Sequence, residues 1–232
     1  TLAMKGGSYV YYFNNYVDRA SLTVFVQPIV HFLSGIGLNF FGKDPVSAGF
    51  GLFNAGGIIF MIVGITLSKR FADKYGKRDV FGTCLFISTL FILAFILFPS
   101  TSVGLMFGSQ ILHGFFYGLT IPLLWAMIAD VADYSELKNN RRATAIIFSA
   151  MMVGLKVGLS LGSAILTWIL GLYHYIPNSN VQSPEAVHGT KLLVSVYPAI
   201  PFLIGAGLMF FYSINKKMEV RLERELKIKR SK

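Results

Sequence analysis

A single lysine, Lys156, lies near the centre of a long apolar stretch over residues 143–172, which contains no Asp, Glu or Arg. Roughly 20 apolar residues of helix cross a bilayer core, so a helix here would place the ammonium near the middle of the membrane. A lysine at that depth costs about 2.5–3.5 kcal/mol on insertion scales and is rare without a partner, a water-filled cavity or a task. A lysine that only snorkels or pairs inside an ordinary helix bundle is the alternative.

The helical period gives Lys156 a polar face. At about 100° per residue, several side chains fall within roughly 40° of it: Ser149, Met152, Ser160, Ser163 and Thr167. The far side carries small residues four apart, namely Ala150, Gly154, Gly158 and Gly162. Small residues at that spacing let a neighbouring backbone approach closely, so we expect tight packing on this side and the wall of a polar cavity on the lysine side. This combination favours a transporter helix.

A second polar stripe runs along the apolar residues 103–129. It consists of Ser109, Gln110, His113, Tyr117 and Thr120, which lie within about 60° of His113. Such a face in a helix surrounded by lipid should point at protein or water. Its hydroxyls, amide and imidazole suit a polyhydroxylated ligand, and hydrogen bonding between helices without a ligand is an equally weighted alternative.

Three other polar positions are candidates for the same ligand. Tyr11 and Tyr12 lie in a tyrosine-rich first segment, whose rings either stack on sugars or mark a membrane interface. Asn54 stands in an otherwise apolar stretch and needs a hydrogen-bond partner.

The composition indicates an integral membrane protein. Hydrophobic residues make up 54% of the chain and charged residues 14%, against about 25% charged residues in soluble domains. The net charge of +10 comes from basic residues in loops and tail, so positive-inside orientation explains it better than nucleic-acid binding. The single cysteine, Cys84, excludes disulfides and Cys-based metal sites. Because the expected spans offer one lysine and one histidine without a carboxylate, we do not expect an enzyme.

Charge-free runs predict an all-α helix bundle in the membrane. The runs cover residues 46–68, 80–98, 103–129 and 192–214, together with 143–172, which is charge-free except for Lys156. Residues 1–17 resemble the end of a span cut at its start. Basic and non-basic connectors alternate, so we expect the basic connectors and the tail, residues 215–232, in the cytoplasm. The tail is expected to be a solvated helix near anionic lipid. Residues 18–45 are either an extracytoplasmic excursion or, over 20–42, one more span.

Two connectors and the first segment carry a family resemblance. Residues 73–78, DKYGKR, resemble part of the cytoplasmic loop signature of the major facilitator superfamily. Residues 129–138, ADVADYSELK, followed by Arg141, Arg142 and the lysine helix, are similar to the glycoside–pentoside–hexuronide:cation symporters, the melibiose-carrier-like branch. Residues 8–17, SYVYYFNNYV, resemble the end of span seven in that branch.

The resemblance implies the C-terminal six-helix half of a twelve-helix alternating-access carrier in a bacterial inner membrane, with its first helix truncated. Residues 18–45 then form an extracytoplasmic insertion. The substrates of that family are glycosides, pentosides or uronides, moved with Na⁺, H⁺ or Li⁺ and without a cofactor. Its acidic cation site lies chiefly in the N-terminal half, so no metal site is expected here. The expected partners are that missing half, a sugar and membrane lipid.

The resemblance also suggests roles for individual residues. Lys156 would couple the cation and substrate sites, and the sugar cavity would be lined by Ser160, His113, Tyr117, Gln110, Tyr11, Tyr12 and Asn54. A cytoplasmic gate would form when charged side chains pair with the other half; its members are Asp73, Arg78, Asp130, Asp133, Glu136 and Arg142. One alternative is a carrier for a lipid-like or drug-like substrate, with a cavity dominated by Met151, Met152, Phe115 and Phe116. Another is a membrane scaffold that transports nothing.

Overall fold

The computed structural model describes residues 2–38, 44–139, 143–177, 179 and 181–230, with the side chains of residues 2 and 230 excepted. The described residues form helices joined by turns: α1 (Leu2–Asn15), α2 (Arg19–Gly35), α3 (Pro45–Tyr75), α4 (Lys77–Leu93), α5 (Val103–Asn139), α6 (Thr144–Leu172), α7 (Pro184–Val194), α8 (Val196–Leu208) and α9 (Lys216–Arg230). Short 3₁₀ turns extend α4 over Ala94–Ile96 and α8 over Met209–Phe211.

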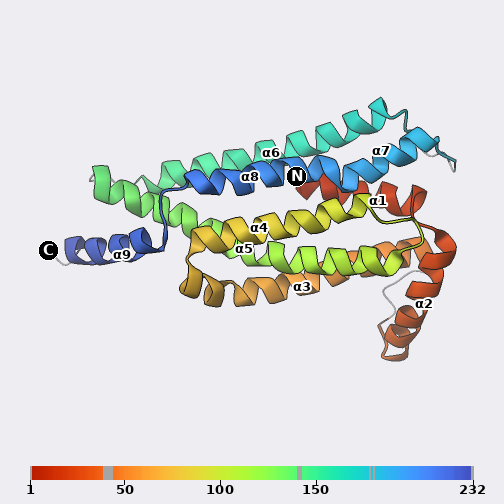
Figure 1. The fold of residues 1–232 in the computed structure, drawn as a ribbon, viewed down its shortest axis with the longest axis horizontal. Coiled ribbons are helices and arrows are strands. Elements are labelled where there is room, and N and C mark those ends of the chain that lie inside the picture. Colours follow the sequence, from red (N-terminus) through yellow and green to blue (C-terminus); the bar gives the residue numbers. More distant parts are fainter. Residues whose placement is uncertain (1, 39–43, 140–142, 178, 180, 231–232) are drawn as a thin grey trace.

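Five helical segments of the described chain are long and apolar enough to cross a membrane. They are Pro45–Tyr75, Lys77–Ile96, Val103–Asn139, Thr144–Leu172 and Pro184–Phe211. These segments lie side by side along the long axis of the molecule (Figure 1). Helix α2 leaves the bundle at one end of that axis, and α9 extends at the opposite end (Figure 1). The prediction of an all-α polytopic membrane protein is confirmed.

Helix boundaries follow the local sequence. The Asp18 carboxylate accepts a hydrogen bond from the Ser21 N–H at 2.8 Å and so caps α2. Asp44 caps α3 through the Ser47 N–H at 2.9 Å, with Pro45 in the first turn, where its missing N–H costs nothing. Gly76 joins α3 to α4 with a φ of 93°, a backbone conformation that favours glycine.

Glycines pack α3 against α5 backbone to backbone. A Cβ atom added at Gly118 would overlap the Met61 carbonyl, and one at Gly114 would overlap the Gly57 carbonyl. On the other helix, a Cβ at Gly64 would overlap the carbonyl oxygen of Phe115. This close approach makes α3 and α5 the most closely joined pair of long helices in the described chain.

Aromatic rings fill the core at the end of the bundle where α2 lies. Phe53 of α3 contacts Phe13 of α1 edge-on, with ring centroids 5.0 Å apart, and Phe107 of α5 at 5.4 Å. Such edge-to-face pairs are the favoured arrangement of aromatic rings. Leu22 and Val26 of α2 are buried in the same cluster, which attaches α2 to the bundle. Residues 19–35 are therefore an ordered helix, and their side of the membrane stays a prediction.

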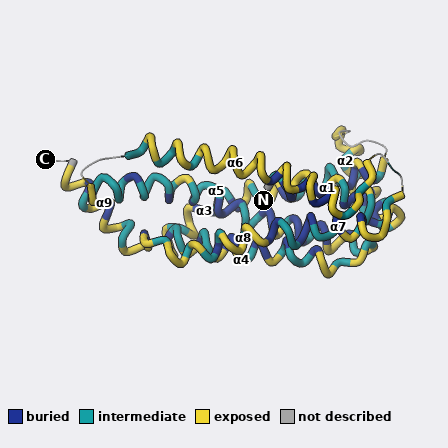
Figure 2. Tube along the Cα trace, turned by 90° about the horizontal axis from the view of Figure 1, so that it is seen from above, coloured by how far each residue is buried: buried dark blue, intermediate teal, exposed yellow. Residues whose placement is uncertain are grey.

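Helix α6 packs along only part of its length. Figure 2 shows exposed residues over most of this helix. Its last turns bury Leu166, Ile169 and Leu170 against Met4 of α1. Tight packing along the small-residue side was predicted and is wrong for most of that side. Ala150, Gly154 and Gly158 are exposed, with nothing within 4 Å of a Cβ added at either glycine, and Gly162 alone among these four is buried. Apart from Phe148, whose ring stacks on Trp125 of α5 with centroids 6.4 Å apart, the described helices pack mainly against the later part of α6.

The last spanning segment is two helices rather than one. The helix breaks at Ser195, whose φ of −117° and ψ of −77° depart from regular helix geometry. Helix α7 packs mainly on α1, where Leu193 is buried beside Met4. Helix α8 packs mainly on α4. The two pieces of one span therefore have different principal neighbours.

The tail forms α9, and this helix is docked. Leu222 and Leu226 are buried, at 5% and 4% exposure. The Lys216 ammonium donates to the backbone carbonyls of Asp73 and Lys74 at the end of α3, where a helix leaves carbonyls without partners. The expectation of a helix is met, but the expectation that it is merely solvated is wrong for its α5-facing side.

Candidate functional site

Lys156 lies on the bare part of α6. Its side chain is exposed, as are those of Ser160 and Met152. Among the described residues none forms a hydrogen bond or ion pair with Lys156. The hydroxyls of Ser163 and Thr167 bond to carbonyls of their own helix, at 3.1 Å and 2.9 Å. The polar face predicted for this helix is thus present, and no other described helix closes it into a cavity.

The polar stripe of α5 points at neighbouring helices. The Ser109 hydroxyl donates to the Phe91 carbonyl of α4 at 2.8 Å. His113 Nδ1 lies 3.0 Å from the Ser88 carbonyl of α4, and because a carbonyl can only accept, Nδ1 carries the hydrogen. The Tyr117 ring stacks on the His113 ring, with centroids 5.8 Å apart. Hydrogen bonding between helices, one of the two expected explanations of this stripe, therefore accounts for Ser109 and His113.

A buried lysine in α1 accompanies Gln110. Lys5 is 4% exposed, and its Nζ lies 3.3 Å from Gln110 Oε1. The Tyr9 hydroxyl donates to the same oxygen at 2.8 Å, and the Lys5 ammonium lies 5.3 Å from the centre of the Tyr9 ring. The expectation of a single lysine in the spans left out Lys5, which is buried in α1, within the segment 1–17 that was itself expected to be part of a span. The signal was present in the sequence as a lysine inside an apolar helix with Tyr9 one turn later.

The three remaining cavity candidates occupy different surroundings. Tyr12 is fully buried and stacks on Tyr16 at 5.0 Å, and its hydroxyl has no hydrogen-bond partner among the described atoms. Tyr11 is half-buried, with its ring edge-on to Tyr175 at 5.1 Å. Asn54 donates to the Phe50 carbonyl of its own helix at 2.9 Å. Their contact with a substrate stays a prediction.

The predicted cytoplasmic gate residues gather at the end of the bundle where α9 lies. Asp130 of α5 accepts two hydrogen bonds from the Lys77 ammonium of α4, at 2.6 Å and 2.7 Å. Arg78 contacts the Asp79 carboxylate at 3.0 Å and donates to the Tyr212 carbonyl at 3.2 Å. These two gate residues thus have partners inside the chain, and neither Lys77 nor Tyr212 was singled out from the sequence.

The other gate residues lie close to α9. Asp73 and Asp133 line a cavity of about 810 Å³ between α9 and the ends of α3, α4 and α5. The Glu136 carbonyl accepts a hydrogen bond from Lys229 at 3.2 Å. Arg142 falls outside the described residues.

Glu219 of α9 is an unpredicted member of this polar region. Its carboxylate accepts a hydrogen bond from the Lys77 N–H, the first backbone donor of α4, at 3.3 Å. Burial raises the pKa of Glu219 above its ordinary value, the Lys77 ammonium opposes that rise, and the neighbouring Asp130 adds to it. The tail helix is therefore tied by polar contacts to both sides of the α3–α4 turn.

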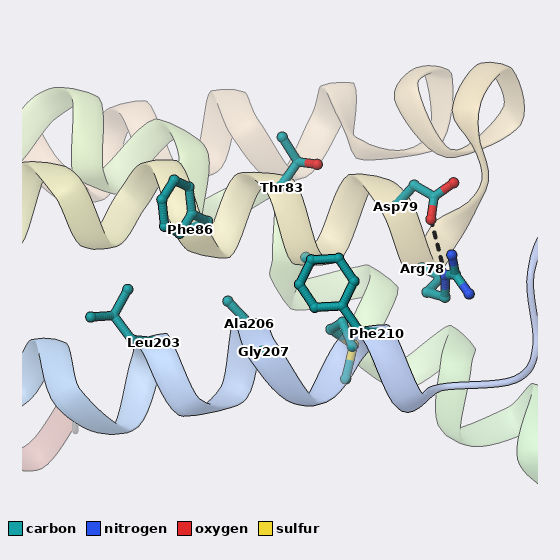
Figure 3. Close-up of a pocket in the computed structure, with 10 residues that line it drawn as sticks. Arg78, Asp79, Thr83, Phe86, Leu203, Ala206, Gly207 and Phe210 are labelled. Carbon is teal, nitrogen blue, oxygen red and sulfur yellow. Dashed lines mark hydrogen bonds and ion pairs between the residues drawn. The ribbon is translucent and has the colours of Figure 1, made fainter.

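A separate crevice of about 490 Å³ opens between α4 and α8 (Figure 3). Phe86 and Thr83 of α4 and Leu203 and Phe210 of the α8 segment line it, and the Arg78–Asp79 ion pair lies at one end (Figure 3). Of the residues predicted to contact a substrate, none lines this crevice. In the part of the chain that the structure describes, no group of three or more His, Cys, Asp or Glu side chains could hold a metal ion.

Comparison with known proteins gives a consistent result. A family model described as MFS/sugar transport protein matches residues 32–216. The chain is 30% identical over 167 residues to the "Putative glycoside/cation symporter YagG" of Escherichia coli strain K12, a match that covers 72% of the chain and 36% of that protein. It is 28% identical over 145 residues to the inner membrane symporter YicJ of the same strain, covering 62% of the chain and 32% of the relative. The chain therefore spans about a third of the length of these two relatives.

Proposed function

Because the chain belongs to the MFS/sugar transport protein family, we propose that it forms one half of a carrier that moves a sugar, glycoside or oligosaccharide together with Na⁺ or H⁺. The carrier works by alternating access, in which two six-helix halves rock around a site near the membrane midplane. Lys156 couples the cation to the substrate. Ser160, Tyr117 and His113 lie on the substrate side of this half.

The observation that carries the proposal is the uncovered lysine on α6. An ammonium near the bilayer centre needs a counter-charge or water, and the described residues supply no partner for Lys156. The surrounding exposed face of α6 is long enough to receive another set of helices (Figure 2). We assign that place to a second half outside this chain, which brings the acidic cation site within reach of Lys156.

The gate residues fit the same arrangement. Asp73, Asp133, Glu136 and Arg142 pair with the second half when the cytoplasmic side closes. Individual exposed pairs contribute little, about 0–1 kcal/mol each. Several that form in one state only can still bias a two-state equilibrium by a few kcal/mol. The Lys77–Asp130 pair, which is already made within the chain, holds α4 to α5 in both states.

The lipid-like or drug-like alternative loses its main support. That alternative needs Phe115 and Phe116 in an apolar cavity. Both rings instead pack against the buried cluster of α4 and α5 that includes Val80 and Leu123. The relatives named above are symporters by name, which also favours a coupled sugar carrier.

The test is coupled uptake by the complete carrier in membrane vesicles, with a labelled glycoside and an imposed Na⁺ or H⁺ gradient. We expect Lys156→Val to abolish accumulation driven by the gradient, while Lys156→Arg retains part of it. Lys191→Val is the matched control. Lys191 belongs to α7, and its ammonium lies over the Tyr16 ring, away from the bare face of α6. Unchanged gradient-driven uptake in Lys156→Val would contradict the assignment.

A further inference from the structure

We propose that Lys5, Tyr9, Gln110 and His113, hereafter the Lys5 cluster, bind the acidic group of the substrate. The ligand class is a sugar derivative that carries a carboxylate or sulfonate. The inference rests on the transport function proposed above and adds a site to it. It assigns Lys5 to the charge of the ligand and leaves Lys156 to the coupling cation.

The Lys5 cluster lies at the depth where a carrier holds its substrate. Lys5 is ten residues before the end of α1 at Asn15, which is about 15 Å at 1.5 Å per residue. Gln110 is seven residues after the start of α5 at Val103, or about 10 Å. With the helix ends at Asn15 and Val103 taken as the membrane boundary, both groups fall in the middle third of a hydrocarbon core about 30 Å thick. Substrate sites of carriers lie near that midplane.

The charge of Lys5 lacks compensation within the described chain. Its one hydrogen bond goes to a neutral amide oxygen, and no carboxylate in the described residues forms an ion pair with it. The acidic residues of the spanning helices lie toward the helix ends, at Asp73, Asp79, Asp130, Asp133, Glu136 and Glu185. Burying an unpaired ammonium is costly, so the site favours an anion that arrives with the ligand.

The surrounding groups leave room for hydrogen bonds to an anion. A lysine ammonium has three N–H donors, and Lys5 uses one of them on Gln110. The Gln110 oxygen is already shared by Lys5 and Tyr9, so it holds both donor side chains in place. His113 lies one helical turn after Gln110 on α5 and keeps its second ring nitrogen, Nε2, beyond the bond to Ser88. Charge-assisted hydrogen bonds to carboxylates and similar oxyanions are the strong ones in proteins.

The glycines around the cluster leave the α1 backbone bare beside Lys5 and let Gln110 pack closely on α3. Gly6, directly after Lys5, is exposed, and nothing lies within 4 Å of a Cβ added there. A ligand can therefore approach the α1 backbone beside Lys5 without meeting a side chain at that position. On the opposite side, a Cβ added at Gly57 of α3 would come within 2.8 Å of the Gln110 amide nitrogen. Gly57 thus lets the Gln110 amide lie flush against α3.

The experiment compares two probes that differ in the acidic group alone. We would measure equilibrium binding of 4-nitrophenyl β-D-glucuronide and 4-nitrophenyl β-D-glucoside to the purified complete carrier by calorimetry. For Lys5→Met we expect glucuronide affinity to fall roughly 10- to 100-fold, the effect of losing a charged hydrogen bond, while glucoside affinity stays within about threefold. Lys5→Arg should retain most of the glucuronide affinity. A second variant, Gln110→Glu, supplies an internal carboxylate to Lys5 and should weaken glucuronide binding selectively.

The outcomes separate this proposal from the transport proposal. Equal loss of both probes in Lys5→Met, or no loss of either, overturns the anion site while sugar binding by the unaltered carrier stands. If the unaltered carrier binds neither sugar but binds 2-hydroxyethanesulfonate in a Lys5-dependent way, the anion site stands and the sugar assignment fails. Absence of binding by all three probes overturns both. Thermal unfolding of each variant verifies that Met at position 5, which matches lysine in length, leaves the fold intact.

Discussion

Glycine has different effects in the α3–α5 pair and in helix α6. In α3 and α5, Gly57, Gly64, Gly114 and Gly118 bring two backbones into direct contact. In α6, Gly154 and Gly158 follow an equally regular spacing, yet nothing lies within 4 Å of a Cβ added at either. Glycine spacing therefore shows where a helix can be approached closely, and only the rest of the fold decides whether it is.

The polar groups of the two regions also differ: those on α5 are held by neighbouring helices, and those on α6 are exposed. On α5, Ser109 and His113 are held by carbonyls of α4, and Gln110 is held by α1. On α6, Lys156 and Ser160 are exposed. The α3–α5 pair is thus the rigid spine of this bundle, and α6 presents an open face. A carrier that rocks around a central site needs both, because one part must stay whole while another engages and releases its partner.

The largest expected effect comes from filling the contact between α3 and α5. Gly118→Leu puts a side chain into the Met61 carbonyl, so we expect it to destabilise the bundle by about 3 kcal/mol or more. Gly158→Leu on α6 is the matched control and should shift stability by less than about 0.5 kcal/mol. Thermal unfolding in detergent measures both. Similar losses in the two variants would remove the distinction between the regions.

The next largest effect is expected in the rate at which a water-soluble reagent labels α6 compared with α5. In a Cys84→Ala background, Ser160→Cys on α6 should react with a hydrophilic thiol reagent at least about tenfold faster than Ser109→Cys, because Ser109 is 5% exposed and bonded to Phe91. Mass spectrometry of labelled protein measures the two rates. Substrate should slow labelling at position 160 and leave position 109 unaffected. A slow Ser160→Cys that ignores substrate would mean that this face of α6 meets no aqueous cavity.

A smaller loss of stability is expected when the ion pair that joins α5 to α4 is removed. Asp130→Asn removes the carboxylate that holds the Lys77 ammonium in a partly buried pair, which should cost about 1–2 kcal/mol. Glu225→Gln breaks the more exposed Arg221–Glu225 pair on α9 and should cost no more than about 0.5 kcal/mol. Chemical unfolding of the two variants, side by side with the unaltered protein, gives both values. Equal costs would show that the Lys77–Asp130 pair does not hold α4 to α5.

The smallest expected effect is a pH dependence of the tail. The pKa of Glu219 is raised on folding from its ordinary value of 4.5, so the folded state holds its proton to higher pH than the unfolded state does. Docking of α9 is therefore strongest at acidic pH and weakens as pH rises through the window above 4.5. Amide hydrogen exchange in α9, corrected for its intrinsic pH dependence, should show less protection at about pH 7.5 than at about pH 5. In Glu219→Gln that difference should shrink, and an unchanged difference would assign it to another group.

Much of the fold could be predicted from the sequence because most membrane spans are marked by long runs without charged residues. Stretches such as 46–68 and 103–129 lack charged residues, and each lies within one long helix. The segment 18–45 was harder, because its Gln27, Pro28 and His31 argue against a span although α2 is a helix with Pro28 inside it. Helix caps at Asp18 and Asp44 explain the bounds of this region, but they say nothing of where it packs.

The candidate site was less accessible to sequence reasoning. Lys5 lies in a short first segment, where a lysine inside an apolar stretch is easily taken for an interfacial group, and its burial against Gln110 distinguishes it from one. Lys77 and Asp130 are 53 positions apart. Asp130 was expected to pair with another half of a carrier, and its partner Lys77 became visible only in the fold. The tight packing expected on α6 failed for a related reason, since spacing along one helix carries no information about the helix that faces it.

The break at Ser195 divides the last span into two helices joined by a non-helical residue. The first piece of this span, α7, packs on α1, which carries the buried Lys5, while its second piece, α8, packs on α4. A tilt of α1 in response to a bound ligand can be absorbed at this joint instead of being passed down to the α4 end of the bundle. The Lys77–Asp130 attachment, at the α4 end, therefore need not move when α1 tilts.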